Sequence, residues 1–380
     1  MDFNFSSEQE QLRDTVNRLI EREYEFNKQR HAIINSPEGY SEKVWASMAE
    51  IGMLGIGIDE AHGGFGGNAI DTMIVMESLG AALVVEPYLA TVVLGANLIQ
   101  LAGSDAQKAT LLPQIVEGKL KLAFAHSEAG ARYDLKRVST TARKDGAAYV
   151  LNGEKIVVLH GQCADKIIVS VATAGALNDG QGLALFLVDA KASGLNITGY
   201  RTIDNQRAAN LHFDNVRVSA DAMLGGSEDN LAVVEQVVDI ANAALVAEAV
   251  GAMGALQKST LEYLKTRRQF GVPIGKFQAL QHRMVDMLMY LELSRSMSYL
   301  VSVKVQLNDA AERQRVVAAA KNAVGRYGRL IAQEAVQLHG GMGITDELAA
   351  SHYFRRLTAI DATLGDADHQ LSRFASNPTF

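Results

Sequence analysis

The most chemically suggestive residues of this chain form a basic cluster at the predicted end of a helix, Arg267-Arg268-Gln269-Phe270-Gly271. A guanidinium at such a bend can bind a phosphate through two hydrogen bonds, and Gln269 could bond a second phosphate oxygen or a ribose. Basic residues near a helix C-terminus also commonly do no more than complement the helix dipole. Taken alone, the cluster is compatible with either role.

Two further clusters could receive a ligand. In Gln337-Leu338-His339-Gly340-Gly341, adjacent glycines after a helix present backbone that a ligand can approach closely. The same glycines could simply end the helix. The segment Ser127-Glu128-Ala129-Gly130 opens the next region of the chain, either as a ligand-binding loop or as an ordinary polar loop.

The periodicity of apolar residues predicts the elements that would position these clusters. Residues 1–120 show helical spacing and predict an N-terminal α-helical domain. Residues 121–228 contain short apolar runs separated by turns, which is typical of a small β-barrel or sandwich domain. Residues 229–380 return to long helical stripes and predict a four-helix bundle. The predicted fold is therefore α+β, with a middle β domain between two helical domains.

Local signals sharpen this outline. Ser7 and Glu10 fit a capping box at the start of the first helix. Asn152–Gly153 predicts a hairpin turn between two strands, and Asp214–Asn215 predicts another turn. The Met and Leu positions of a stripe over 277–291 are interpreted as core.

Composition excludes several classes of function. The chain has 380 residues, is 48% hydrophobic and 21% charged, and carries a net charge of −7, which argues against nucleic-acid binding. We expect a cytoplasmic protein, because the N-terminus does not fit a signal peptide and no apolar run predicts a membrane span. The single cysteine, Cys163, excludes an internal disulfide and a cysteine-based metal cluster, and we expect no metal. Neither glycine-rich segment fits a nicotinamide-binding motif.

The three clusters, taken in order, resemble segments of one family. RRQFGVPIGKFQ and QLHGGMG are its most specific matches, and HGGFGG, AHSEAGARYD and LNGEKIVVLHG are similar to further family segments. Over nearly its whole length the chain resembles the acyl-CoA dehydrogenase family.

This resemblance implies FAD as cofactor and α,β-dehydrogenation of an acyl-CoA thioester, with electrons passed to an electron-transfer flavoprotein. A carboxylate would remove the α-proton while the β-hydrogen leaves as hydride to the flavin. The resemblance places Arg267 on the FAD pyrophosphate, with Gln269 and Phe270 beside it. It places Gln337, Gly340 and Gly341 against the adenosine-diphosphate end of FAD across a dimer interface, and Ser127 near the flavin.

The departures from the family pattern gather at the expected active site. The ungapped match of RRLTAIDATLGD puts Leu364 where the family carries its catalytic glutamate. The position used by a minority of the family is Ala244, with Leu245 beside it. Val157 stands where an aromatic residue flanks the flavin, and Leu159 replaces a hydroxyl residue.

Several sources of a base stay open. Glu248 lies one helical turn beyond Ala244 and could supply the carboxylate, which would make the protein a self-sufficient homotetramer. Asp361 and Asp366 flank Leu364, but their side chains are shorter. Each of these three could instead be an ordinary solvated or paired carboxylate.

The hypothesis that we favour is a base supplied by another chain. AEAVGAM, EPYLATVVLG and SEAGARYD look like segments of the small subunits of heteromeric acyl-CoA dehydrogenases, such as those acting on pimeloyl-CoA or steroid side chains. We expect a tetramer in which this chain is the base-lacking partner and shares an FAD site with a second subunit. A further alternative is a catalytically inert flavoprotein or acyl-CoA binder.

Overall fold

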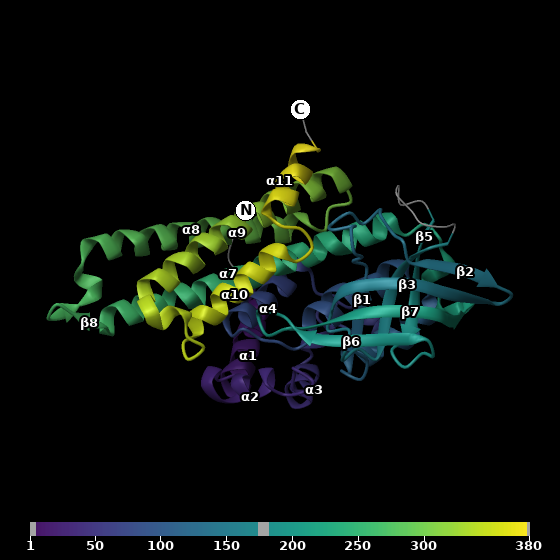
Figure 1. Ribbon diagram of the computed structural model, residues 1–380, viewed down its shortest axis with the longest axis horizontal. Helices are drawn as coiled ribbons and strands as arrows, with labels where there is room; N and C mark the ends of the chain where they lie inside the picture. The colour runs from purple at the N-terminus through teal and green to yellow at the C-terminus, as the bar shows by residue number, and fades with distance from the viewer. Residues whose placement is uncertain (1–4, 174–181, 378–380) are drawn as a thin grey trace. The chain divides into compact units, whose positions relative to one another are not determined.

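The computed structural model describes residues 5–173 and 182–377. Within these residues the chain forms two compact units, each assembled from segments that are distant in sequence. One comprises 5–32, 69–84 and 242–377, and the other comprises 33–68 and 85–241. Along the chain, helices precede the strands and long helices follow them (Figure 1), which confirms the predicted fold class.

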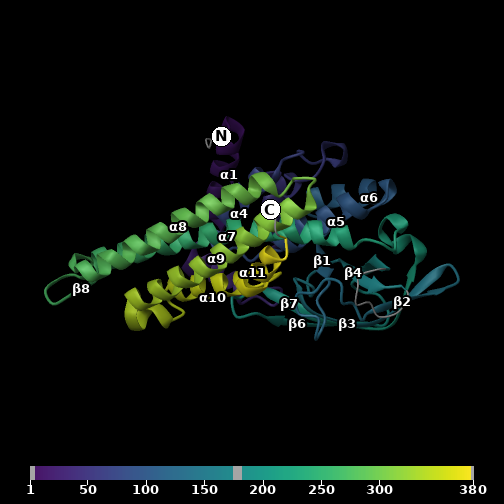
Figure 2. The same cartoon turned by 90° about the horizontal axis from the view of Figure 1, so that it is seen from above.

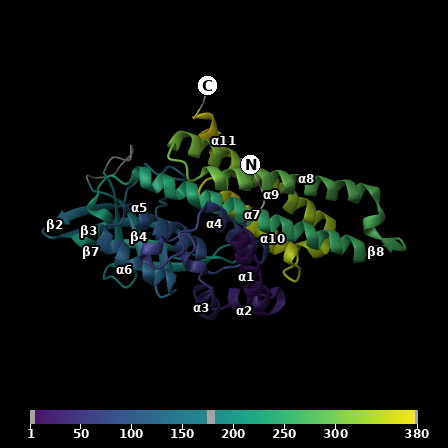
Figure 3. The same ribbon diagram turned by 180° about the vertical axis from the view of Figure 1, so that it is seen from behind.

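The first unit is helical, and α9 is its central element. Contacts join α9 to α8, α10 and α11, and Figure 2 shows these helices running side by side. Contacts also join α1 to α4, which Figure 3 shows in purple and dark blue. The helices of this unit are α1 (Ser7–Glu23), η1 (Phe26–Arg30), α2 (His31–Ile34), α4 (Ala69–Ala81), α7 (Leu231–Thr266, from residue 242 onward), α8 (Gln278–Lys304), α9 (Ala310–His339), α10 (Ala349–Ala362) and α11 (Ala367–Ala375).

The second unit is built around one seven-stranded sheet, in the order β1-β4-β2-β3-β7-β6, with β5 paired to β4. Most pairings are antiparallel, but β1 and β2 each run parallel to β4. The strands are β1 (Leu122–Ala125), β2 (Thr141–Asp145), β3 (Ala148–Leu159), β4 (Lys166–Ala172), β5 (Leu183–Asp189), β6 (Leu195–Arg201) and β7 (Arg207–Ser219). The helices of this unit include α3 (Glu42–Glu50), η4 (Leu89–Ala96), α5 (Asn97–Ala102) and α6 (Asp105–Val116).

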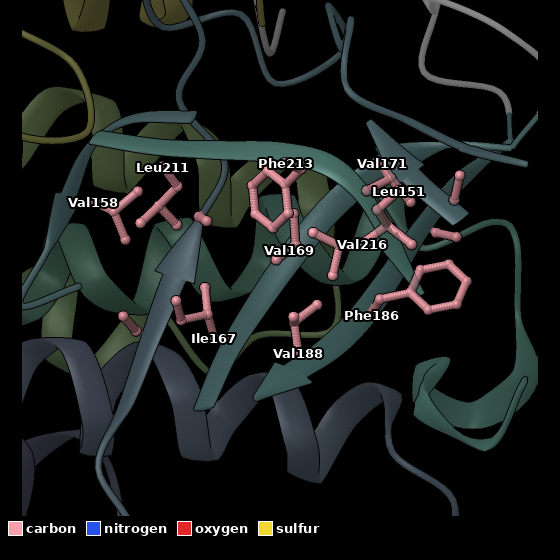
Figure 4. Packing of buried hydrophobic residues seen from close by; sticks show 14 of the residues in the cluster. Leu151, Val158, Ile167, Val169, Val171, Phe186, Val188, Leu211, Phe213 and Val216 are labelled. Atoms are coloured by element: carbon pink, nitrogen blue, oxygen red, sulfur yellow. The ribbon is translucent and has the colours of Figure 1, made fainter. Parts of the chain in front are cut away.

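The core of the sheet is formed by aliphatic and aromatic side chains from one face of its strands. Phe213 and Val169 lie close together in Figure 4, and Phe186 packs against Tyr149 with ring centroids 5.0 Å apart. These side chains are almost completely buried. Burying a side chain of this size contributes about 1.5–3 kcal/mol to stability. The alternating apolar residues of the sequence form this core.

Two turn predictions in the β region were wrong. β3 runs through Asn152–Gly153 without turning, and Asn215 lies inside β7 with a φ of 51°. The two strands share an irregularity in register here, and the backbone N–H of Asn215 donates to Oδ1 of Asn152 at 2.9 Å. The turn between β2 and β3 instead contains Gly146, whose φ is 64°. At this bulge Asn215 adopts the left-handed conformation without reversing the chain.

The first helix begins one residue earlier than predicted. Its capping box pairs Ser6 with Gln9, because the Ser6 hydroxyl accepts from the backbone N–H of Gln9 and the Gln9 side chain accepts from the backbone of Ser6. The longest helix, α7, is apolar enough over part of its length to cross a membrane. However, 89% of that window is buried inside the protein, as in the core helix of a globular fold.

Helix α8 has two apolar faces, and only one of them is core. Met284, Met287 and Leu291 are buried as predicted, whereas Leu288 is 45% exposed, so its assignment to the core was wrong. Leu288 belongs to an exposed apolar face that recurs at helical spacing, which we call the α8 stripe: Val285, Leu288, Met289, Leu293, Leu300 and Val303. Large apolar side chains gathered in this way on one surface are typical of an interaction site.

Candidate functional site

A cavity of about 560 Å³ lies in the helical unit, where α7 and α9 end and α8 begins. It brings together residues from the first two sequence clusters, which are some 70 positions apart along the chain. Five of the predicted site residues line it: Arg267, Gln269, Gln337, Gly340 and Gly341. Sequence reasoning missed other lining residues, among them Tyr263 and Arg283, whereas His339 lies in the predicted second cluster.

A small hairpin fixes Arg267 at the wall of this cavity. Helix α7 ends at Thr266, and the carbonyl of Arg267 accepts from the backbone N–H of Ile274 at 2.8 Å. The turn that follows contains Phe270 and Gly271, with φ values of 52° and 80°, as a tight two-residue hairpin requires. Phe270 lies at its tip and is 90% exposed, so it does not line the cavity.

Arg267 and Arg268 have different surroundings. Arg268 donates to the carbonyl of Gly271 at 2.9 Å and so closes the hairpin. Arg267 lines the cavity, where its guanidinium can meet an anionic ligand. The sequence cluster therefore contains one residue for the hairpin and one for the cavity.

The opposite wall is backbone without side chains. Helix α9 ends at His339, and Gly340 follows with a φ of 61°. A Cβ added at either Gly340 or Gly341 would meet nothing within 4 Å, so this space is open to a ligand. His339 is held by Tyr263, whose hydroxyl donates to the His339 carbonyl at 3.3 Å, and by its own bond to the carbonyl of Ala335.

This arrangement fits the phosphate-containing part of a dinucleotide cofactor such as FAD. The cavity combines two cations, Arg267 and Arg283, with two amide side chains, Gln269 and Gln337. Arg283 is paired with Glu334, so Arg267 is the better placed of the two to meet an anion. A guanidinium and amides can bind phosphate and ribose oxygens, and the glycine backbone at 340–341 admits close approach. Among the described residues, no group of three or more His, Cys, Asp or Glu side chains could hold a metal ion.

The turn between α10 and α11 contains Leu364 in a left-handed conformation, with a φ of 56°. The carbonyl of Leu364 accepts from Asn242 at 3.4 Å and from Gln370 at 3.3 Å. Leucine has no group that can accept a proton, and Ala244 on α7 is buried and equally inert. Neither position that the family resemblance marks for a base therefore carries one.

Glu248 is a buried, paired carboxylate. Its two oxygens accept from Nε and Nη2 of Arg356 at 2.6 and 2.7 Å, and both side chains are almost fully enclosed. The helices also approach closely here, since a Cβ on Gly80 of α4 would lie 2.0 Å from the carbonyl oxygen of Glu248. This geometry favours a structural role for Glu248, because a base must have an oxygen free to meet the substrate.

The two aspartates near Leu364 have structural partners. Asp361 accepts from Arg329 at 2.7 Å and from the backbone N–H of Ala367 at 3.1 Å. Asp366 is the N-cap of α11 and accepts from the backbone N–H of His369 at 2.9 Å. Each stabilises the junction of α10 with α11, as capping and paired carboxylates do.

Ser127 belongs to a loop of the β unit that is backed by a buried ion pair. Nζ of Lys155 donates to Glu128 at 2.7 Å, and Lys155 is completely buried. Burial lowers the pKa of Lys155 to about 8, although Glu128 opposes that shift. The carbonyl of Ser127 accepts from the backbone N–H of Ile156 at 2.9 Å, which fixes the loop to β3.

The neighbouring segment of β3 is strained. Val157 has a φ of 53°, which is rare for a β-branched residue, and its side chain is 49% exposed. Its backbone N–H donates to Oδ1 of Asn210 at 3.2 Å. Strained residues of this kind concentrate at functional sites.

Comparison with known proteins identifies the relatives of this fold. Three acyl-CoA dehydrogenase domain families match the chain, the N-terminal domain over 6–119, the middle domain over 123–216 and the C-terminal domain over 231–377. The mitochondrial long-chain specific acyl-CoA dehydrogenase of Sus scrofa is 30% identical over 356 residues, covering 89% of this chain and 79% of its own.

Two solved structures share the fold over almost the entire chain. Butyryl-CoA dehydrogenase from Megasphaera elsdenii has a TM-score of 0.90 at 27% identity and covers 99% of each chain. A chain of the ChsE4-ChsE5 complex from Mycobacterium tuberculosis has a TM-score of 0.88 at 25% identity, covering 99% of this chain and 98% of that one.

Proposed function

Because the chain belongs to the acyl-CoA dehydrogenase family, whose cofactor is FAD, we propose that it takes part in α,β-dehydrogenation of an acyl-CoA thioester as a base-lacking subunit of a heteromeric enzyme. When bound, FAD would accept the β-hydrogen as hydride. The observation that supports the proposal is a cavity lined by Arg267, Gln337 and Gly340–Gly341, together with leucine at position 364, where the family resemblance implies a base.

The roles of this chain's own residues follow from the geometry. Arg267 would bind the pyrophosphate, Gln269 and Gln337 would bond its oxygens or a ribose, and Gly340–Gly341 would receive the adenosine-diphosphate end. Ser127 would lie near the flavin, and Phe270, exposed at the hairpin tip, would contact a second subunit. The base that removes the α-proton would come from that second subunit.

The α8 stripe supports assembly with another chain. Its members are between 40% and 63% exposed, and a stable interface needs apolar surface of this kind at its centre. A chain of the ChsE4-ChsE5 complex is among the structural neighbours, so the fold occurs in an assembly of two named proteins. We propose a tetramer of two such chains with two base-bearing partners, which passes its electrons to an electron-transfer flavoprotein.

The assembly is tested by co-expressing this chain with a base-bearing acyl-CoA dehydrogenase subunit from the same genome. We expect a defined hetero-oligomer by light scattering and more FAD per chain than in the chain purified alone. A Leu288→Lys/Leu293→Lys variant should lose the complex, whereas the matched Lys304→Met variant outside the stripe should keep it. If the chain alone forms an FAD-saturated tetramer that oxidises acyl-CoA at an ordinary rate, the proposal is wrong.

Two alternative functions can be tested, one with a variant and one with a binding and reduction measurement. In a self-sufficient homotetramer Glu248 would be the base, and Glu248→Gln would abolish turnover while leaving FAD bound. In a catalytically inert flavoprotein or acyl-CoA binder, acyl-CoA would bind without reducing the flavin, either with or without a partner. Both carboxylate oxygens of Glu248 accept hydrogen bonds from Arg356, which argues against the first alternative.

A further inference from the structure

Helix α9 contains a lysine whose ammonium group is completely enclosed by backbone oxygens. Nζ of Lys321 donates to four carbonyl groups at the end of α10 and in the following turn. These belong to Ile360 at 2.9 Å and to Asp361, Thr363 and Gly365 at 3.0 Å each. Lys321 is 0% exposed.

The four carbonyls explain why a charge can be buried here. The last carbonyls of a helix have no partner within the helix and form the negative end of its dipole. An ammonium ion supplies three donors, so the four oxygens share them and surround the cation. Burial lowers the pKa of Lys321 to about 8, and the carboxylates of Asp361 and Asp366 oppose that shift.

The arrangement holds position 364 from both sides. Lys321 bonds the carbonyls of the residues before and after Leu364, while Asn242 and Gln370 bond the carbonyl of Leu364 itself. Three different helices, α7, α9 and α11, therefore fix one turn. A leucine with positive φ is strained, and strain persists only where the surroundings over-determine the backbone.

We propose that Lys321 is a positioning residue that holds the backbone of position 364 in the geometry of a catalytic base, although this chain carries leucine there. The inference rests on the proposed function, in which the base has been lost. The backbone conformation that would position a base at residue 364 is nevertheless retained. Plain capping of α10 would need only the carbonyls of the helix, whereas two of the four bonds go to Thr363 and Gly365 beyond its end at Ala362.

The inference predicts a gain of function. A Leu364→Glu variant would place a carboxylate on a backbone that is already fixed. With FAD as the two-electron oxidant, this carboxylate would take the α-proton, the β-hydrogen would leave as hydride to the flavin, and the α C–H electrons would form the new C=C bond. Substrate-dependent flavin reduction should then appear in the chain without its partner.

The test compares L364E with L364E/K321M, using K304M as the matched control, because Lys304 pairs with Glu312 on the surface of the same unit. Loss of Lys321 should lower the gained turnover by about 100-fold through misplacement of the base, with little change in KM. The L364E/K304M variant should keep the rate of L364E. A purely structural role would instead lower the amount of folded, FAD-bound protein without changing the rate per flavin.

A second measurement does not depend on any gained activity. Hydrogen exchange in the Leu364 background should accelerate roughly tenfold or more at residues 363–367 in K321M, because a buried charge-assisted hydrogen bond is lost. The remainder of α9 should be unchanged. If K321M does not fold, Gln370→Met removes one bond to Leu364 and should act in the same direction.

The outcomes separate this inference from the proposed function. Equal rates for L364E and L364E/K321M, or equal exchange at 363–367 in the Leu364 chain and in K321M, would overturn the role of Lys321. Turnover by the unaltered chain alone would overturn the proposed function. The exchange measurement would still test whether Lys321 holds the backbone at 363–367.

Discussion

The ion pair between Glu248 and Arg356 makes a prediction that separates structure from catalysis. Both side chains lie in the helical unit, joined by hydrogen bonds of 2.6 and 2.7 Å. Their side chains are only 5% and 10% exposed, respectively. Glu248→Gln keeps the shape of the side chain but removes the charge that balances the guanidinium.

The expected cost is large. Removing one partner of a buried ion pair typically destabilises a protein by about 3–5 kcal/mol, because the other charge stays buried. We therefore expect Glu248→Gln to lower the free energy of unfolding by roughly 3 kcal/mol, since glutamine can still accept one of the two bonds. Replacing both residues, as in Glu248→Leu with Arg356→Leu, should restore most of that loss.

The assay is urea unfolding followed by far-ultraviolet circular dichroism, which reports on the helices. Fluorescence of the only tryptophan, Trp45, would follow the other unit, where that residue lies. The surface pair Lys304–Glu312 is the control, and breaking it should cost less than about 1 kcal/mol. If Glu248→Gln leaves stability unchanged but abolishes acyl-CoA oxidation, Glu248 is a base and the structural interpretation is refuted.

The remaining predictions concern the cofactor cavity and the response to acid. Arg267→Met should weaken FAD binding by about 10- to 100-fold, whereas Arg268→Met should weaken it far less, as measured by titration of the apoprotein. Gly341→Ala should also weaken FAD binding, but it should leave the melting temperature of the apoprotein unchanged because the added Cβ meets open space. Burial, with the Lys155 charge nearby, lowers the pKa of His126 to about 4. Between pH 6.5 and 4 the unfolded chain therefore binds a proton that the folded protein does not, and stability should fall as the pH falls, by at most about 3 kcal/mol from this group. A His126→Gln variant should flatten that part of the pH–stability curve, and an unchanged slope would contradict the assignment.

Periodicity was sufficient to predict the fold because the long helical stripes and the alternating strands each have a strong, repeated signal. The turn prediction at Asn152–Gly153 was wrong because this dipeptide, which favours a hairpin turn, is accommodated in a β-bulge. The outcome there depends on β7, whose Asn215 bonds back to Asn152. A signal confined to two residues cannot include a partner some 60 positions away.

The family resemblance grouped residues that the structure brings to one cavity, whereas the bonds that hold the Leu364 turn were not predicted. Arg267 and Gly340–Gly341 belong to contiguous motifs, and the family resemblance implies that both contact one ligand. Lys321 lies four residues after Val317, on the same buried face of α9, and a lysine at helical spacing from buried apolar residues is the signal that could have identified it. Its four partners are backbone carbonyls, which leave no trace in the side-chain sequence.

The pairing of Glu248 with Arg356 was hidden for a related reason. The two residues are 108 positions apart, and each alone is compatible with an exposed polar face. Only the packing of α7 against other helices of its unit shows that both are enclosed. From the sequence, a lone carboxylate on an apolar helix such as Glu248 is a candidate base. The structure shows that it is one partner of a buried ion pair.

Anaerobic flavin bleaching shows whether an FAD-loaded form of this chain has a base of its own. The chain is loaded with FAD and mixed with a panel of acyl-CoA thioesters, first alone and then with a base-bearing partner subunit. We expect no loss of the oxidised-flavin absorbance for the chain alone and rapid loss in the complex. Rapid bleaching of the FAD-loaded chain by itself would contradict this expectation.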